Sequence, residues 1–326
     1  MQKVLVTGAT GYLGAKICLH LHHLGYHVVA LCRNLSKYQY QIFKDITIIE
    51  GDIIEEATFQ KLSKLDLQAI VHTVSLDHNL SETSSIDKVN QINVLATWKL
   101  IDLFSKQSNP LIIYFSTIHT LGKLPNETID ENFEPNPLNV YGLTHLFGEN
   151  LINYYYQQCG ERAISLRLTN GYGSPVFSNN NCWNLVINNL CKEAYLNQKI
   201  VLQSDGKALR DFIHVDDIAN AVSLLMQQPI FNHSIFHVSS GRTYSLLELA
   251  FLVKKYYEKR YAKSIQVFHS KDIPVDDYVE LIPNKMYTIN NQRFKNIGFK
   301  IGVDIEQGIH DLFNYFEKYL KKINQS

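Results

Sequence analysis

Short apolar runs alternate with amphipathic segments through the first half of the chain. The runs that read as buried strands are Lys3–Val6, His27–Leu31, Ile46–Glu50, Ala69–Thr73, Leu111–Ser116 and Ala163–Leu168. Segments with a helical period lie between them, at Ala15–Leu24, Val89–Phe104 and Tyr141–Gln158. Near-continuous apolar strands separated by helices are typical of a parallel sheet covered on both faces. The pattern predicts the α/β class, with a doubly wound parallel sheet of the Rossmann type.

Beyond Thr169 this alternation breaks into shorter pieces rich in Asn, Tyr and Pro. We interpret them as a smaller C-terminal lobe, with the run Ile235–Val238 returning to the sheet. We expect residues 1–170 to form the dinucleotide-binding domain, with 212–240 returning to it. Residues 171–211 and 241–326 are expected to form mainly the substrate-binding lobe, since loop-rich lobes over the carboxyl ends of strands usually hold the substrate.

The turn between the first strand and the first helix is rich in glycine. Gly8, Gly11 and Gly14 follow the strand at three-residue spacing. Such a turn presents backbone N–H groups at the positive end of a helix, which favours a diphosphate. We expect Gly8 to permit the tight turn, Gly11 close backbone approach and Gly14 close helix–strand packing. The alternative is a glycine-rich turn with no ligand. The expected cofactor contacts here are Gly8, Thr10, Gly11, Tyr12 and Leu13.

Composition narrows the possible partners. The 326 residues include 31 Lys plus Arg and 31 Asp plus Glu, so no charge excess points to nucleic acid or to an anionic membrane surface. No apolar run is long enough to cross a membrane, and no signal peptide is evident. The five cysteines include no Cys-x-x-Cys pair, and His20, His22 and His23 lack an acid or cysteine companion at ligand spacing. We therefore expect reduced thiols, no metal site and a cytoplasmic location.

The residues after the second strand bear on which dinucleotide fits. An NAD site usually has an acid there for the ribose 2′-hydroxyl, whereas this chain has Cys32, Arg33 and Asn34. A guanidinium at Arg33 suits a 2′-phosphate, so we expect NADP, with NAD possible. The alternative is that Arg33 is a solvated loop residue. After the third strand, Asp52 with Ile53 is expected to contact the adenine, unless Asp52 simply caps the next helix.

Six motifs in order give the chain a family resemblance. They are Thr7-Gly-Ala-Thr-Gly-Tyr-Leu-Gly14, Asn93-Val-Leu-Ala-Thr97, Phe115-Ser-Thr117, Tyr141-Gly-Leu-Thr-His145, Arg167-Leu-Thr-Asn170-Gly-Tyr-Gly-Ser-Pro175 and Arg210-Asp-Phe-Ile-His-Val-Asp-Asp217. Together they resemble the extended short-chain dehydrogenase/reductase family of nucleotide-sugar epimerases, dehydratases and reductases, over nearly the whole chain.

The resemblance implies roles for individual residues. Thr117 and Tyr141 would polarise a sugar oxygen while hydride passes to or from the nicotinamide, with Tyr141 exchanging the proton. Arg210 would grip the nucleotide diphosphate, and Asn170 would reach the sugar or a phosphate. The alternative for Arg210 is a structural ion pair with Asp216 or Asp217. We also expect a homodimer and a place in surface polysaccharide biosynthesis.

One departure concerns the cation that such a tyrosine needs to act as a base, because its hydroxyl has an ordinary pKa of about 10. The family has a lysine four residues after the tyrosine. Here position 145 is His, and no lysine lies between Lys123 and Lys192. His145 either bonds the nicotinamide ribose and, when protonated, lowers the pKa of Tyr141, or the catalytic function is weakened and the fold only binds a cofactor.

A second departure concerns the reaction. The 4,6-dehydratases of the family carry Asp-Glu directly after the catalytic Thr, whereas Thr117 is followed by Ile118 and His119. We therefore disfavour dehydration. His119 is a substrate contact, a second acid or a packed loop residue. The expected activity is an NAD(P)-dependent epimerase or oxidoreductase acting on a nucleotide-activated sugar. The alternative is a catalytically weakened dinucleotide-binding or redox-sensing module.

Overall fold

The computed structural model describes residues 2–34, 40–107, 109–158, 160, 162–228, 231–269, 273–275 and 286–319. Its main sheet has seven parallel strands in the order β11-β7-β5-β4-β1-β2-β3. They are β1 (Lys3–Thr7), β2 (His27–Cys32), β3 (Thr47–Glu50), β4 (Ala69–His72), β5 (Leu111–Thr117), β7 (Ala163–Leu168) and β11 (Ile235–Val238). The predicted doubly wound parallel sheet is confirmed.

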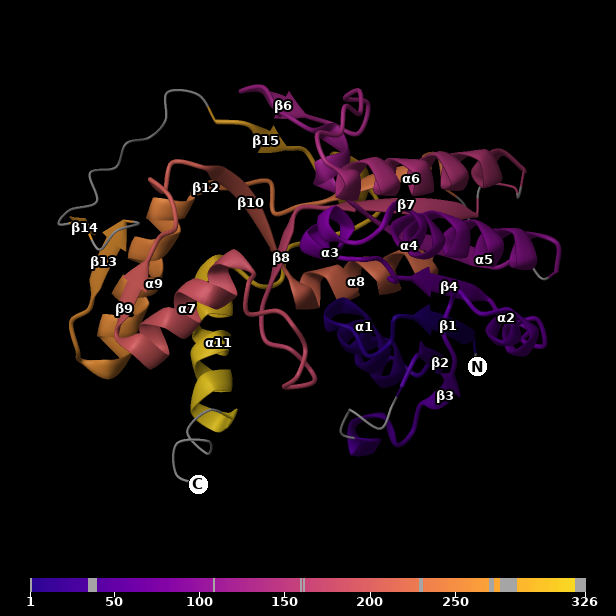
Figure 1. Cartoon of the computed structure of the whole chain (residues 1–326), viewed down its shortest axis with the longest axis horizontal. Coiled ribbons are helices and arrows are strands. Elements are labelled where there is room, and N and C mark those ends of the chain that lie inside the picture. The colour runs from indigo at the N-terminus through magenta and orange to yellow at the C-terminus, as the bar shows by residue number, and fades with distance from the viewer. Residues whose placement is uncertain are drawn as a thin grey trace.

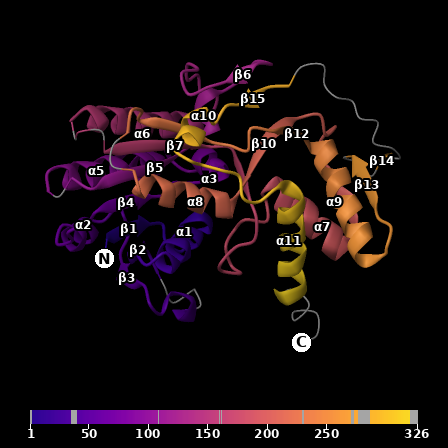
Figure 2. The ribbon, with the colours of Figure 1, turned by 180° about the vertical axis from the view of Figure 1, so that it is seen from behind.

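Helices cover both faces of this sheet (Figures 1 and 2). The helices α1 (Tyr12–His23) and α8 (Val215–Met226) pack together on one face. The helices α5 (Ala96–Ser105) and α6 (Val140–Gln158) pack together on the other. The strand order reverses between β1 and β4, and ligands of such sheets bind outside the carboxyl ends of the strands at that point.

A smaller C-terminal lobe lies beside the main sheet (Figure 1). One of its sheets contains β8 (Asn170–Tyr172), β10 (Leu209–His214) and β12 (Thr243–Ser245). The other contains β9 (Lys199–Val201), β13 (Gln266–His269) and β14 (Ile273–Val275). Its helices are α7 (Val186–Asn197), α9 (Leu246–Tyr261) and α11 (Ile305–Tyr319). They have their own apolar core, in which Leu249 and Phe313 are fully buried.

The predicted return of the chain to the main sheet is confirmed, because β11 pairs in parallel with β7. Phe236 and Val238 of β11 belong to the same apolar core as the strands of the N-terminal domain. The shorter elements are η1 (Tyr40–Phe43), α2 (Glu56–Leu62), α3 (His78–Thr83), η3 (Ile118–Leu121), β6 (Thr128–Ile129), β15 (Thr288–Ile289) and α10 (Gln292–Asn296).

The helix expected at Val89–Phe104 is interrupted. It consists of α4 (Ile86–Val89), a π-helical segment η2 (Asn90–Leu95) and α5. In the wider turn, the buried Asn93 side chain accepts a hydrogen bond from the backbone N–H of Leu76 at 2.8 Å and donates one to Thr144 at 3.0 Å. These bonds tie the segment after β4 to α6, and they account for a local departure from the α-helical period.

Within the described ranges, no helix is long and apolar enough to cross a membrane. Cys18, Cys32, Cys182 and Cys191 are free thiols and are buried. Cys159 lies outside the described residues.

Candidate active site

The glycine turn between β1 and α1 is packed so closely that it has no room for side chains at Gly8 and Gly14. Gly8 has a φ of +67°, and a Cβ on it would lie 2.8 Å from Thr73 Oγ1. A Cβ on Gly14 would lie 2.2 Å from the carbonyl oxygen of Gly8, so only glycine permits this approach of helix and strand. No side chain caps the start of α1 at Gly11. The first N–H groups of α1 are therefore left for a ligand, and the cradle fits a dinucleotide diphosphate.

Two segments of the C-terminal lobe are hydrogen-bonded to the glycine turn. The Tyr12 hydroxyl donates a hydrogen bond to the carbonyl oxygen of Gly173 at 2.8 Å. The Asn180 amide donates to the carbonyl oxygen of Thr10 at 2.8 Å. Sequence reasoning missed Gly173 and Asn180 in this role, because 161 and 170 residues separate the partners.

The ends of β2 and β3 lie side by side. Arg33 is exposed directly after β2. Asp52 accepts a hydrogen bond from the backbone N–H of Ile54 at 3.2 Å, and α2 begins only at Glu56, so Asp52 does not cap that helix. Glu50 lies across from Cys32 in the sheet register. An acid is therefore close to the end of β2, although none follows that strand in the sequence.

Thr117 and Tyr141 meet at the carboxyl end of the sheet. Thr117 ends β5, and Tyr141 lies in the first turn of α6 with its hydroxyl near the Thr117 side chain. Burial raises the pKa of Tyr141 to about 12, although the neighbouring Thr117 side chain opposes the shift. Tyr141 is therefore protonated at neutral pH and can donate a proton to an oxygen placed beside it.

His145 lies one turn further along α6 and is 4% exposed. Its Nδ1 is 3.0 Å from the Tyr114 hydroxyl, and its Nε2 is 3.0 Å from Ser75 Oγ. Burial, with smaller effects of His119 and His72, lowers the pKa of His145 to about 3. The expected partial positive charge is not supported, because a buried imidazole in this setting stays neutral. Both ring nitrogens are also engaged by the protein, which leaves neither free for a ribose hydroxyl.

Two other histidine rings face Tyr141. The His119 ring lies 5.7 Å from the Tyr141 ring, and the ring of His78, the first residue of α3, lies 6.1 Å from it. The backbone N–H of His119 donates to Thr117 Oγ1 at 3.3 Å. Sequence reasoning missed His78, since no motif contains it.

Arg210 and Asn170 lie on the neighbouring strands β10 and β8. The Asn170 amide donates to the carbonyl oxygen of Asp211 at 2.9 Å. Arg210 is exposed, and its guanidinium donates to the carbonyl oxygen of Leu209 at 2.9 Å. Burial lowers the pKa of His119, and the charges of His78 and Arg210 lower it further. The charge of Arg210 therefore acts on a histidine whose ring faces Tyr141.

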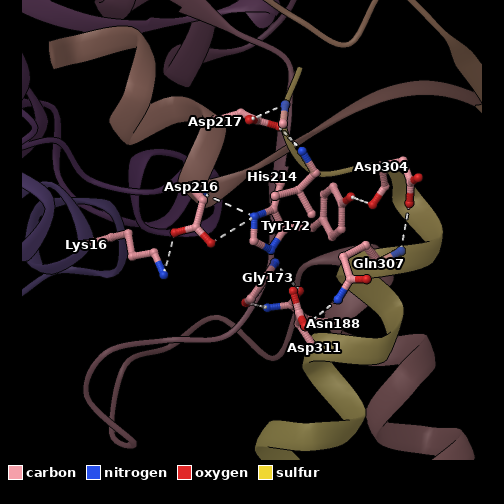
Figure 3. Close-up of polar contacts among 12 residues, drawn as sticks. Lys16, Tyr172, Gly173, Asn188, His214, Asp216, Asp217, Asp304, Gln307 and Asp311 are labelled. Carbon is pink, nitrogen blue, oxygen red and sulfur yellow. Dashed lines mark hydrogen bonds and ion pairs between the residues drawn. The ribbon is translucent and has the colours of Figure 1, made fainter. Parts of the chain in front are cut away.

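The alternative partners of Arg210 are engaged elsewhere (Figure 3). Asp216 forms an ion pair with Lys16 at 2.6 Å. Asp217 accepts hydrogen bonds from the backbone N–H groups of Gly302 and Val303 at 2.8 and 3.2 Å. Among the described residues, neither aspartate is paired with Arg210.

A buried ion pair between Arg167 and Glu149 lies next to the candidate site. Both Nε and Nη2 of Arg167 donate to the Glu149 carboxylate, at 2.8 and 2.7 Å, and both side chains are 2% exposed. Ser116 also donates to Glu149, at 2.5 Å. This pair joins β7, α6 and, through Ser116, the residue before Thr117 on β5, so it links the elements that carry Thr117 and Tyr141.

The fold and the glycine cradle define a dinucleotide-binding enzyme class, and the comparison with known families agrees. The model of the NAD dependent epimerase/dehydratase family matches residues 4–238, and the chain belongs to this family. The predicted family is confirmed.

Individual relatives span almost the whole chain. A putative UDP-glucose 4-epimerase of Methanocaldococcus jannaschii is 24% identical over 315 residues, which cover 96% of this chain and 98% of that protein. The crystal structure of UDP-glucose 4-epimerase from Thermotoga maritima with UDP-glucose superposes with a TM-score of 0.81 at 19% identity, over 98% and 100% of the two chains. UDP-glucuronic acid 4-epimerase from Bacillus cereus, in complex with UDP-glucuronic acid and NAD, gives 0.79 at 20% identity, over 97% and 99%.

Proposed function

We propose that the protein is an NAD(P)-dependent epimerase or oxidoreductase acting on a nucleotide-activated sugar. The observation that carries this proposal is the proximity of the Thr117 and Tyr141 side chains at the carboxyl end of β5, on the sheet that also carries the glycine turn. A bound nicotinamide dinucleotide supplies the hydride acceptor or donor. Tyr141 gives its proton to the sugar oxygen when a carbonyl is reduced and takes it back when a hydroxyl is oxidised, while Thr117 holds that oxygen in place.

For the cofactor we propose NADP, because Arg33 is exposed at the end of β2 and suits a 2′-phosphate. NAD is the second candidate. It is favoured by Glu50, which lies across from Cys32, and by the NAD in the Bacillus cereus complex. In either case Gly8, Thr10, Gly11, Tyr12 and Leu13 would hold the diphosphate, and Asp52 with Ile53 would face the adenine.

For the substrate we propose that the lobe of residues 171–211 and 241–326 holds the nucleotide. Arg210 would grip the diphosphate, and Asn170 and His119 would contact the sugar. Relatives named for UDP-glucose and UDP-glucuronic acid support this class. Dehydration is disfavoured because Ile118 and His119 follow Thr117, with no carboxylate for eliminating water. The product would serve surface polysaccharide biosynthesis.

We propose a homodimer formed through α5 and α6. Leu143, Phe147 and Tyr154 of α6 are 41%, 44% and 59% exposed and follow one another along the helix. Trp98 of the adjacent α5 is 49% exposed. A stripe of large apolar side chains over two neighbouring helices suits the self-complementary contact of a two-fold dimer. Sedimentation velocity tests this, since Phe147→Arg should yield monomers while native protein sediments as a dimer.

The second candidate function is a weakened dinucleotide-binding or redox-sensing module. The neutral His145 favours it, because a cation near Tyr141 would otherwise assist proton removal. The exposed guanidinium of Arg210 favours the enzyme, since a pure cofactor sensor has no need of an arginine that binds a substrate diphosphate.

The test is mass spectrometry of UDP-, dTDP-, CDP- and GDP-sugars incubated with the protein and either cofactor. We expect at least one sugar to be converted. Tyr141→Phe should abolish that conversion, whereas Tyr155→Phe, on the same helix with its hydroxyl bonded to Asp102, should not. Cofactor binding without conversion of any sugar would favour the binding module.

A further inference from the structure

Two hydroxyl groups from different parts of the main sheet hold the His145 ring. The Tyr114 hydroxyl, on β5, lies 3.0 Å from Nδ1, and Ser75 Oγ, in the segment after β4, lies 3.0 Å from Nε2. Tyr114 and His145 are both buried. Water is therefore not at hand to replace either partner, and the position of the imidazole proton follows from which partner donates and which accepts.

The reach of Tyr114 across α6 depends on a glycine. A Cβ on Gly148 would lie 2.3 Å from the Tyr114 hydroxyl oxygen, so the tyrosine ring occupies the space of a missing side chain. On its other side, the His145 ring lies 4.6 Å from the Tyr141 ring, edge to face at 72°. Tyr114 is thus connected to Tyr141 through a single imidazole.

The hydrogen bonds of the two hydroxyl groups assign the tautomer of His145. The one hydroxyl hydrogen of Ser75 is donated to the carbonyl oxygen of Leu76 at 2.9 Å, so Ser75 accepts from Nε2–H. The bare Nδ1 then accepts from Tyr114, whose hydroxyl has no other hydrogen-bond partner among the described residues. Burial and the charge of Glu149 hold the pKa of Tyr114 well above its usual value, so the hydroxyl keeps its hydrogen. The opposite tautomer would leave that buried O–H without an acceptor, which is unfavourable.

The other groups near the His145 ring oppose a second proton on balance. Beyond the effect of burial, His119 and His72 lower the pKa of His145, and the backbone carbonyl of Phe115 raises it, with a result of about 3. The ring that lies against Tyr141 is therefore neutral at physiological pH.

We propose that Tyr114 and Ser75 are positioning residues that hold His145 neutral, with its proton on Nε2, at the position where the resembling family has a lysine. The inference rests on the proposed function, because it concerns how Tyr141 is held while it exchanges a proton with the sugar oxygen. A donor to the bare nitrogen stabilises only the neutral ring, whereas an acceptor of Nε2–H serves the neutral and the charged ring alike. Removing Tyr114's hydroxyl should therefore ease protonation of His145, and removing that of Ser75 should not.

The test is nitrogen-15 NMR of the full-length protein with labelled histidine, in which the His145 signals are those that His145→Gln removes. At pH 7 we expect a protonated Nε2 and a bare Nδ1. Tyr114→Phe should shift the Nδ1 signal and raise the pKa of His145 by about one pH unit or more, and Ser75→Ala should not raise it. The matched control is Tyr156→Phe, which removes another buried hydroxyl, one that donates to the carbonyl oxygen of Phe231 at 2.8 Å. It should leave the His145 signals as in native protein.

A proton on Nδ1 in native protein overturns the proposal, and so does a pKa that rises in Ser75→Ala and not in Tyr114→Phe. Cofactor reduction by the sugar identified in the turnover screen is measured alongside. Tyr114→Phe should slow it by about tenfold or more and add an ionisation to its pH profile, while Tyr156→Phe follows native protein. A native rate and pH profile in Tyr114→Phe overturn the positioning role. Native protein that reduces the cofactor with no sugar overturns the proposed function and this role in it, whereas the NMR result decides the tautomer independently.

Discussion

Replacing Gly14 by alanine tests the cofactor cradle at a single methyl group. The added Cβ would lie 2.2 Å from the carbonyl oxygen of Gly8, 2.8 Å from its carbonyl carbon and 3.1 Å from the Cα of Ala9. Non-bonded heavy atoms attract at roughly 3.5 Å, so the start of α1 must move by about 1 Å. All three atoms belong to the backbone, and no side chain can yield instead.

Overpacking of this kind costs about 1–3 kcal/mol, which corresponds to roughly a 5- to 150-fold loss of affinity if the cost falls on the bound geometry. Isothermal titration calorimetry with NAD and NADP should show this loss. Gly25→Ala is the matched control at the other end of α1, where φ is +85° and no atom lies within 4 Å of the new Cβ. It should lower the melting temperature through backbone strain and leave cofactor affinity unchanged. Native affinity in Gly14→Ala would refute the role given to the cradle.

Three further outcomes are expected. Arg33→Ala should remove a preference for NADP over NAD in the same titrations, and equal affinities in native protein would contradict the 2′-phosphate assignment. Arg210→Ala should weaken binding of nucleoside diphosphates by more than about tenfold at low salt and leave dinucleotide binding unchanged; a parallel loss of both would indicate a structural role. Burial lowers the pKa of His72 to about 4 and of His145 to about 3, so the unfolded chain binds protons first as the pH falls below about 6.5. The free energy of unfolding is therefore not reduced by these histidines above about pH 6.5. As the pH falls from there toward 3, it decreases by up to about 1.4 kcal/mol per pH unit for each group. In urea unfolding, His145→Gln should show a shallower fall, and an unchanged slope would contradict the assigned pKa.

The main sheet could be predicted from the sequence because its strands are buried on both faces. Every residue of β4 and β5 is buried, so the apolar runs are almost continuous and the strand bounds match within a residue or two. The helix over Val89–Phe104 was predicted less well. Its periodicity gives no sign that the Asn93 amide would be drawn inward by Leu76 and Thr144, which are distant in the sequence.

The candidate site also contains some residues that the sequence predicts and others that only the fold reveals. Thr117, Tyr141 and Arg210 stand in motifs. The fold places Thr117 and Tyr141 at the carboxyl end of β5 and Arg210 on β10 of the lobe. The neutral state of the His145 imidazole could not be read from the sequence, because it depends on burial and on partners 31 and 70 residues away in the chain. Glu50 was missed because only the pairing of β2 with β3 places it across from Cys32.

The central claim is that Tyr141 transfers the proton in a hydride exchange with a nucleotide sugar. The most direct measurement is a single-turnover experiment that follows the absorbance of reduced nicotinamide, with the sugar and cofactor identified by the turnover screen. Native protein should show reduction of the cofactor, and Tyr141→Phe should slow it by on the order of two to four decades while the dissociation constant of the cofactor stays unchanged. Reduction at the native rate in Tyr141→Phe would contradict the account.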